Sequence, residues 1–119
     1  MDATDDLIIQ GKPVDSVNEY NVGIALDRLG YEYEYQKYVG IPGVRGLIIV
    51  DFLVYTTPKP TPLFVHGEYW HSGRFRAESE FQQAALNQRM RGIWADAVII
   101  WEHQCETIED DINALKNIL

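Results

Sequence analysis

The stretch Leu47-Ile-Ile-Val-Asp-Phe-Leu-Val-Tyr55 decides the fold, because it is a nearly continuous apolar run of the length typical of a β-strand. Its single charged residue is Asp51. A carboxylate inside such a strand has a large desolvation cost unless it is paired or binds a metal ion. Alternatively, the strand is exposed at this point and Asp51 is solvated. The run therefore predicts a strand and leaves two interpretations of its acid open.

Alternating helices and strands are predicted on both sides of this strand. Residues 17–29 carry apolar side chains at helical spacing, and Tyr31-Glu-Tyr-Glu-Tyr35 has the two-residue period of a half-buried strand. Further along the chain we expect a strand at 63–70, a helix at 78–91, a strand at 97–101 and a helix at 106–119. This order predicts an α/β fold with a mixed central sheet of about four strands flanked by helices.

Length and composition fit one compact domain. The chain has 119 residues, of which 46% are hydrophobic, so that one core can be buried. Residues 1–14 are predicted to be an N-terminal arm with an edge strand that ends at Pro13, and 15–119 a single domain. The apolar runs are shorter than the roughly 20 residues that cross a bilayer, and the acidic start is unlike a secretion signal. We therefore expect a soluble, intracellular protein of bacterial or phage origin, with no membrane partner.

The net charge of −8 argues against a nucleic-acid partner, because proteins that follow phosphates normally carry excess Lys and Arg. Two features soften this argument. Several acids lie near the termini, and a bound divalent cation would change the local sign of the charge. In addition, four arginines gather after the candidate site described next: Arg74, Arg76, Arg89 and Arg91.

The segment Val65-His66-Gly67-Glu68-Tyr69-Trp70-His71 ends the next predicted strand and carries two of the three histidines of the chain. Divalent-metal sites and general-base sites both require imidazole and carboxylate groups that converge, often at a strand end. The competing interpretation is an ordinary polar strand end with one core tryptophan. We expect this segment to lie beside Asp51 and to form a functional site with it.

Glu19 also has two interpretations. It lies on the inward stripe of the first predicted helix, three residues before Val22 and seven before Leu26. However, Ser16-Val-Asn-Glu19 matches the S-x-x-E capping box, in which the glutamate accepts a hydrogen bond from a backbone N–H. Judged on spacing alone, helix capping explains Glu19 without any catalysis.

Taken together, these residues resemble the very-short-patch repair endonucleases and the related EDxHD homing endonucleases, a branch of the PD-(D/E)xK nuclease superfamily. Three blocks carry the resemblance: Glu19 with residues 30–36, Val50-Asp51-Phe52, and 64–71 with 98–102 downstream. The His-Gly-x-aromatic-Trp-His string is its specific part. The resemblance implies a restriction-endonuclease-like core and a DNA endonuclease that depends on Mg²⁺, for which Mn²⁺ can substitute.

The resemblance also implies roles for individual residues. Asp51 is expected to bind the catalytic magnesium, and Val65 to offer a backbone carbonyl where the superfamily usually has a second acid. His71 is expected to activate water, His66 to assist at the scissile phosphate, and Glu19 to support a metal-bound water. Capping remains the alternative for Glu19.

Further residues are expected to contact DNA or the metal. Tyr69 and Trp70 match aromatics that wedge between base pairs, although a core tryptophan is the competing interpretation. Glu68 stands at a position of the repair family's zinc site and becomes an extra metal ligand or a salt-bridge partner, and we expect no structural zinc. Three arginines are candidates for phosphate contacts, although exposed arginines often contact only water: Arg74, Arg76 and Arg89.

Two departures from the family leave other functions open. Gly67 stands where the superfamily has a lysine, and the second predicted helix lacks the basic pattern of the repair enzymes. One alternative is a catalytically degenerate nuclease-fold module that binds DNA or a protein partner. Another is a nuclease that requires a homodimer or a separate DNA-recognition subunit.

Overall fold

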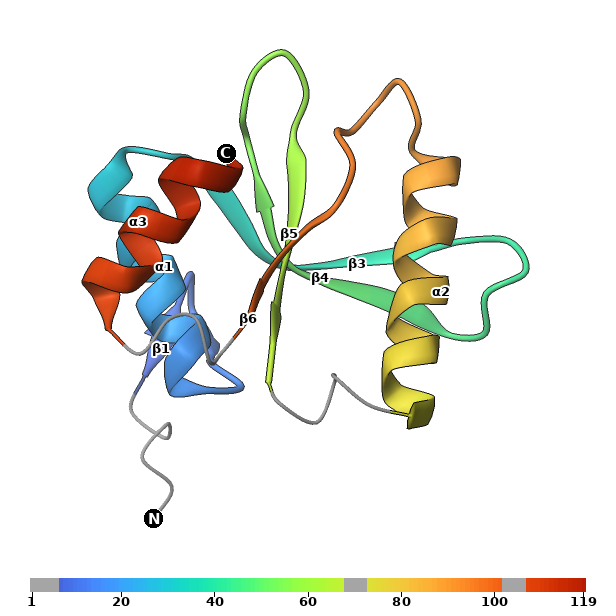
Figure 1. The fold of residues 1–119 in the computed structure, drawn as a ribbon, viewed down its shortest axis with the longest axis horizontal. Coiled ribbons are helices and arrows are strands. Elements are labelled where there is room, and N and C mark those ends of the chain that lie inside the picture. The colour runs from blue at the N-terminus through green and yellow to red at the C-terminus, as the bar shows by residue number, and fades with distance from the viewer. Residues whose placement is uncertain (1–6, 68–72, 102–106) are drawn as a thin grey trace.

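The computed structural model describes residues 7–67, 73–101 and 107–119, with α2 residues 73–76 as backbone only. Figure 1 shows three helices and a central sheet, with the predicted order of elements. None of the helices in these ranges is long and apolar enough to cross a membrane. The elements are β1 (Ile8–Ile9), β2 (Lys12–Pro13), α1 (Val17–Leu29), β3 (Tyr33–Gly40), β4 (Leu47–Val54), β5 (Thr61–His66), α2 (Gly73–Arg89), β6 (Val98–Trp101) and α3 (Ile108–Ile118).

The central sheet has the strand order β3-β4-β5-β6. Its first three strands are antiparallel neighbours, whereas β5 and β6 are parallel. Parallel neighbours need a crossover connection, and α2 lies in the chain between these two strands. The predicted α/β fold with a mixed sheet of four strands is thereby confirmed.

Several predicted boundaries were wrong, for identifiable reasons. The arm forms its own two-stranded hairpin, β1–β2, rather than an edge strand of the main sheet. β3 continues to Gly40, because its second half pairs with the outer end of β4. β5 spans Thr61–His66 rather than the predicted 63–70. Pairing with β6 begins only at Leu63, so Pro62 has no residue of β6 to which a backbone N–H would donate. A proline, which lacks this N–H, is therefore tolerated at the position.

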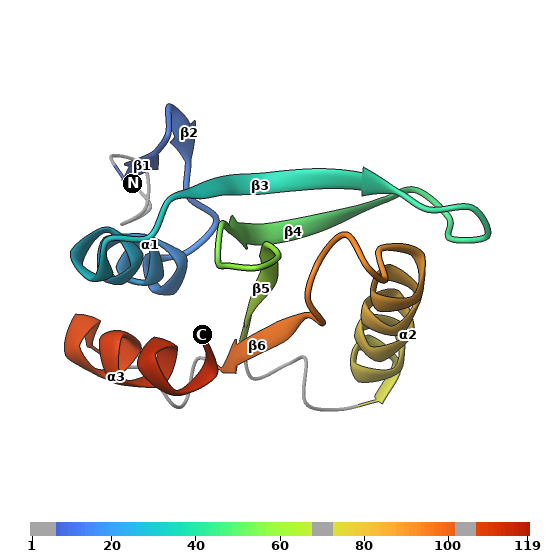
Figure 2. The same ribbon diagram turned by 90° about the horizontal axis from the view of Figure 1, so that it is seen from above.

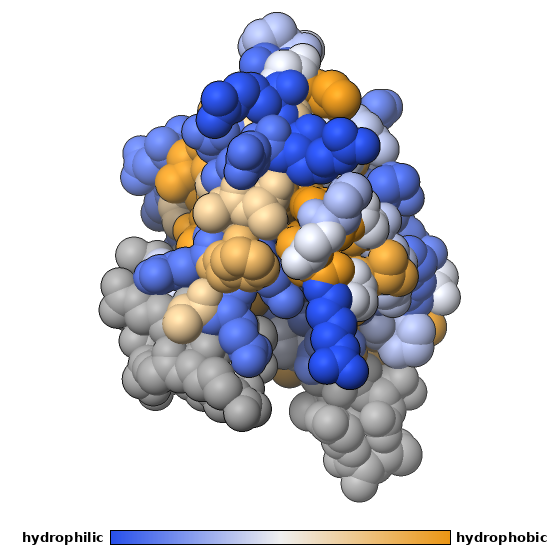
Figure 3. All heavy atoms as spheres, turned by 90° about the vertical axis from the view of Figure 1, so that its right-hand side faces the viewer, coloured by the Kyte–Doolittle hydropathy of each residue, from blue (hydrophilic) through white to orange (hydrophobic). Residues whose placement is uncertain are grey.

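Two apolar clusters lie on opposite sides of the β5–β6 part of the sheet. The first joins α1 and α3 to the sheet through buried residues that include Leu26, Leu63 and Leu115. The second joins α2 to the sheet and includes Phe64 and Leu86. Figure 2 shows α1 and α3 on one side of these strands and α2 on the other. On the side of the molecule seen in Figure 3, apolar side chains are interspersed with hydrophilic ones.

Strand β4 contributes residues to both clusters, and all of them have even numbers. Phe52 and Val54 belong to the cluster of α1 and α3, whereas Ile48 and Val50 belong to the cluster of α2. Residues two apart in a flat strand share a face. The strand must therefore turn about its own axis between Val50 and Phe52, which is the position of Asp51.

Strands β4 and β5 separate at the same point. Their pairing covers Phe52, Leu53 and Val54 of β4, whereas β3 accompanies β4 out to Leu47. Leu63 pairs with both neighbours, and from Phe64 onward β5 pairs with β6 alone. Figure 2 shows the β3–β4 hairpin running toward α2 while β5 turns away from it. The outer half of β4 and the end of β5 therefore form the two walls of a cleft.

Candidate functional site

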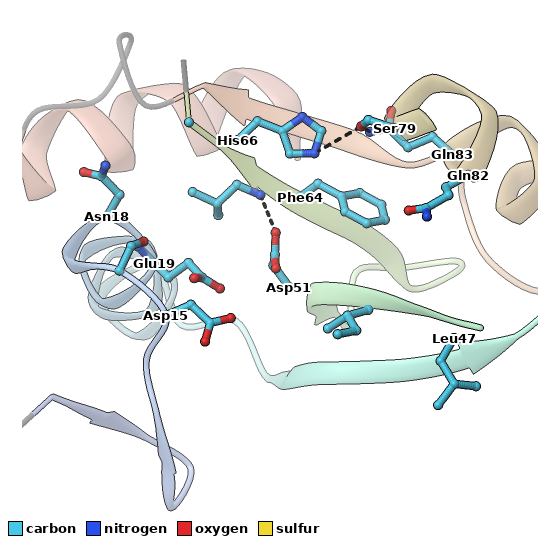
Figure 4. A pocket seen from close by; sticks show the side chains of 14 residues that line it. Asp15, Asn18, Glu19, Leu47, Asp51, Phe64, His66, Ser79, Gln82 and Gln83 are labelled. Carbon is cyan, nitrogen blue, oxygen red and sulfur yellow. Dashed lines mark hydrogen bonds between the residues drawn. The ribbon is translucent and has the colours of Figure 1, made fainter. Parts of the chain in front are cut away.

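The cleft between β4 and β5 holds a cavity of about 500 Å³. Its walls come from the start of α1 with the residues just before it, the outer half of β4, the end of β5 and one face of α2. Figure 4 shows carboxylates at one end of the cleft and the polar side chains of α2 at the other. Segments that are distant in the sequence thus meet at the point where β4 twists.

Asp51 points into the cleft toward the end of β5. Its Oδ2 accepts a hydrogen bond of 2.7 Å from the backbone N–H of Val65 (Figure 4). Burial raises the pKa of Asp51 to about 7; the Val65 N–H opposes this shift, and the charge of Asp15 adds to it. Asp51 is therefore a partly buried acid with one backbone donor, rather than a side chain in contact with solvent alone.

Glu19 lies beside Asp51 and is only 5% exposed. Its Oε1 accepts a hydrogen bond of 3.2 Å from the hydroxyl of Tyr35. Burial, together with the charges of Asp51 and Asp15, raises the pKa of Glu19 to about 8. A hydrogen bond between the two acids raises the pKa of Glu19 and lowers that of Asp51. Burial and the neighbouring negative charge therefore favour the protonated forms of both acids.

The capping-box interpretation of Glu19 needs correction. The N-cap itself is confirmed, since the Ser16 hydroxyl accepts a hydrogen bond of 3.1 Å from the Glu19 backbone N–H. The Glu19 carboxylate, however, is directed toward Tyr35 and Asp51. The S-x-x-E pattern thus accounts for Ser16, whereas the glutamate belongs to the cleft.

His66 is buried and lines the same cleft, but its imidazole is directed toward α2. Its Nε2 lies 3.5 Å from the Ser79 hydroxyl, which accepts a hydrogen bond of 2.9 Å from the Gln83 amide. Its ring contacts the edge of Trp101 at a centroid distance of 5.1 Å. The structure therefore brings His66 to the cleft with Asp51 and places it on the wall opposite Glu19 (Figure 4).

Sequence reasoning missed four side chains of this region: Asp15, Tyr35, Ser79 and Gln83. Asp15 accepts a hydrogen bond of 3.1 Å from Gln36 and contributes negative charge to both buried acids. Ser79 and Gln83 are four residues apart on α2, the spacing at which helical side chains meet. That spacing was a usable signal, whereas nothing local connects Tyr35 with Glu19.

Several predicted site residues stay predictions. Glu68, Tyr69, Trp70 and His71 lie outside the described residues. The same holds for the side chains of two arginines in the first turn of α2, Arg74 and Arg76. Arg89 is exposed in the last turn of α2, more than one turn beyond Gln83, which lines the cleft.

The oxygen atoms of the cleft suit a hard divalent cation. Among the described residues there is no group of three or more His, Cys, Asp or Glu side chains that could hold a metal ion. Mg²⁺, however, typically keeps several waters and binds proteins through one or two carboxylates. Asp51 and Glu19 supply two carboxylates. In an extended strand the N–H and C=O of one residue project to the same side, so that the Val65 carbonyl faces Asp51 as its N–H does.

Comparison of the chain with protein-family models, with curated proteins and with solved structures finds no match in any of the three. The similarity to the PD-(D/E)xK nucleases therefore stays a prediction from the sequence. The geometry adds an independent observation, a desolvated pair of acids at the fork of two strands.

Proposed function

We propose that this protein is a metal-dependent DNA endonuclease whose catalytic cation binds at Asp51. One observation carries the proposal: the carboxylates of Asp51 and Glu19 lie next to each other at one end of the cleft, where Asp51 accepts the Val65 N–H and Glu19 is buried. Among the described residues that line the cleft, none is a lysine or an arginine. A divalent cation would neutralise this pair and remove its repulsion, because an ion is often the largest local charge in such a site.

In this proposal, residues of the cleft and His71 have separate roles in phosphodiester hydrolysis. Asp51 and the Val65 carbonyl would hold the cation, and Glu19 would orient a water. When bound, Mg²⁺ would supply positive charge that stabilises the charge developing on the phosphate and on the leaving oxygen. His71 would take a proton from the attacking water as a bond forms between the water oxygen and phosphorus. The bond to the 3′ oxygen would break, and this oxygen would leave as a hydroxyl after taking up a proton from solvent water. His66 contacts the phosphate from the α2 wall.

DNA as the substrate rests on the resemblance and on residues after β5. Tyr69 and Trp70 would contact bases, while Arg74, Arg76 and Arg89 would contact phosphates. The net charge of −8 weakens association with a polyanion. A homodimer or a separate DNA-recognition subunit would supply the missing positive surface.

The decisive experiment incubates supercoiled plasmid with the protein and Mg²⁺ or Mn²⁺. Asp51→Asn keeps the size of the side chain and an acceptor for the Val65 N–H, whereas Asp96→Asn changes an exposed acid outside the cleft and serves as the control. We expect the parent and the control to nick or linearise the plasmid. Asp51→Asn should lose more than about 100-fold in rate, since even residues that only orient metal ligands are worth about 10–100-fold. His71→Ala should lose activity as well. Equal cutting by all four proteins would indicate a contaminant and would refute the assignment.

A catalytically degenerate nuclease-fold module is the second candidate. Gly67 at the place of the superfamily's lysine favours it. Calorimetric titration with Mg²⁺ and Mn²⁺ separates the two functions, because the nuclease requires metal uptake that Asp51→Asn abolishes. A parent protein that binds DNA but shows no Asp51-dependent uptake would be the module.

A further inference from the structure

A second cavity, of about 620 Å³, lies between β1, the C-terminal half of α1 and the start of β3. Among the described residues it shares no lining residue with the catalytic cleft. Four of its lining residues are tyrosines: Tyr20, Tyr31, Tyr33 and Tyr55. This concentration is notable in a chain with seven tyrosines, and the proposed nuclease chemistry does not use it.

The tyrosines are held in place by their neighbours. The Tyr33 ring packs edge-on against Phe52 at a centroid distance of 5.4 Å. The Tyr55 hydroxyl donates a hydrogen bond of 3.3 Å to Glu34. Gly23 of α1 lines the same cavity, and a Cβ there would lie 2.7 Å from Cδ1 of Ile9, which also lines it. The glycine therefore allows β1 to lie close against the helix and close one side of the cavity.

The cavity carries negative charge. Asp27 and Glu32 line it, and among its described lining residues there is no lysine, arginine or histidine. It also borders the end of α1, where the helix dipole is negative. Burial and the charge of Asp27 raise the pKa of the Tyr33 hydroxyl to about 12, as expected in a negative environment.

We propose that this cavity, through Tyr31, Tyr33, Tyr55, Asp27 and Glu32, binds an organic cation: a guanidinium or alkylammonium group. Aromatic faces attract such cations through the ring quadrupole, and the two carboxylates add direct attraction. Anions are repelled by the same acids. A divalent metal would require closely spaced oxygen ligands, whereas tyrosine rings offer extended faces. The group can come from a basic side chain of a partner protein or from a free amine.

Amide-detected NMR titration tests the proposal with matched probes. N-acetyl-argininamide and N-acetyl-lysinamide present the two cations, and N-acetyl-citrullinamide has nearly the shape of the first without its charge. We expect saturable shifts at Gly23, Tyr31 and Tyr33 with at least one cation, and binding about ten-fold weaker with the citrulline compound, which corresponds to about 1.4 kcal/mol. Equal binding of charged and neutral probes would overturn the proposal. Shifts centred on Asp51 and Glu19 would overturn it too, because the cation would then occupy the other acidic site.

Charge variants identify the site without a large change to the core. Asp27→Asn with Glu32→Gln removes two exposed negative charges at the cavity, and Glu80→Gln with Asp96→Asn removes two exposed charges elsewhere. Only the first pair should weaken cation binding by about ten-fold or more. Equal weakening by both pairs would show attraction to net charge alone and would refute a specific site. A Gly-Gly-Arg-Gly-Gly peptide that binds more tightly than the single amide identifies a polypeptide partner, whereas equal affinity identifies a free amine.

Discussion

The two halves of β4 differ although they belong to one strand and pair with the same neighbour, β3. The inner half, Phe52–Val54, is buried, and its Phe52 and Val54 pack among apolar side chains between the sheet and α1. The outer half, Leu47–Asp51, borders the cleft and has Leu47 61% exposed and Ile49 46% exposed. The inner half therefore serves the core alone, whereas the outer half combines two core residues, Ile48 and Val50, with an acid that it presents to the cavity. The change from one role to the other occurs at a single position, Asp51.

Truncation of the inner half should have the largest effect. Phe52→Ala removes a fully buried ring that contacts both Tyr33 and Tyr35. We expect a loss of about 3–5 kcal/mol in the free energy of unfolding, as is usual for buried aromatic residues. Ile49→Ala on the outer half should lose less than about 1 kcal/mol, because the side chain is half exposed. Urea denaturation of both variants checks the difference, and similar losses would show that the two halves do not divide in this way.

The backbone opposite Asp51 provides the second comparison. The pairs Tyr35–Phe52 and Lys37–Val50 place Gln36 across from Asp51, and Gln36 has a φ of 54°. A β-branched residue tolerates this left-handed conformation poorly, although it favours ordinary strands. Gln36→Val should therefore be about 1–3 kcal/mol less stable than Gln36→Gly.

The neighbouring position is the control for this strain. Lys37 lies in the regular ladder, so Lys37→Val should be more stable than Lys37→Gly. Both sets of variants are compared by urea denaturation. The same ranking at both positions would mean that Gln36 is not strained and that the twist of β4 has another cause.

Much of the structure of β4 can be predicted from the local sequence, but its twist at Asp51 cannot. The helix at 17–29 and the strand at 47–54 were predicted almost to the residue, because apolar periodicity records which face is buried. Asp51 was singled out for the same reason, as a charge that interrupts an apolar run. The twist at Asp51 and the left-handed Gln36 lie across from each other in the β3–β4 pairing, and no local pattern of apolar residues encodes them.

The hydrogen-bond partner of the Glu19 side chain could not be predicted from the sequence, for a related reason. Spacing alone assigned the residue to a capping box, and the serine half of that motif is present. The carboxylate turns to Tyr35, sixteen positions away, because β3 crosses the start of α1. A hydrogen bond of this kind depends on tertiary structure, which periodicity does not report.

The stability of the protein should depend on pH because the two acids of the cleft, Asp51 and Glu19, have raised pKa values. The pKa values of Asp51 and Glu19 are raised to about 7 and about 8, so the folded state keeps protons that the unfolded chain releases near pH 4. Without divalent metal, the free energy of unfolding should therefore fall as pH rises from about 5 to about 8. Asp51→Asn removes one of the two acids and should reduce this fall by at least about 1 kcal/mol.

Urea denaturation at pH 5 and pH 8 in EDTA measures the fall. Asp96→Asn, an exposed acid before β6, should keep the slope of the parent. Addition of Mg²⁺ at pH 8 should stabilise the parent more than Asp51→Asn, because a ligand of the folded state raises its stability. Identical slopes in all three proteins would show that the acids of the cleft titrate normally.

Tyr35 of β3 contacts both the inner half of β4 and an acid of the cleft, and it provides the finest test. Its ring packs against Phe52 at a centroid distance of 5.1 Å, while its hydroxyl donates to Glu19 at 3.2 Å. Tyr35→Phe keeps the ring in the core and removes only the donor. We expect a small loss of about 0.5–1.5 kcal/mol, the usual net value of one hydrogen bond.

The stronger prediction for Tyr35→Phe concerns Glu19 itself. The hydroxyl lowers the pKa of Glu19, so its removal should raise that pKa above about 8. Carboxyl carbon NMR measures the titration directly. Tyr33→Phe is the control, because its hydroxyl is directed toward the Gly23 carbonyl at 3.5 Å rather than toward the cleft. If Tyr35→Phe leaves the titration of Glu19 unchanged, the core and the cleft are separate. If the pKa of Glu19 rises in this variant alone, a residue of the core, Tyr35, helps to set the charge of the cleft.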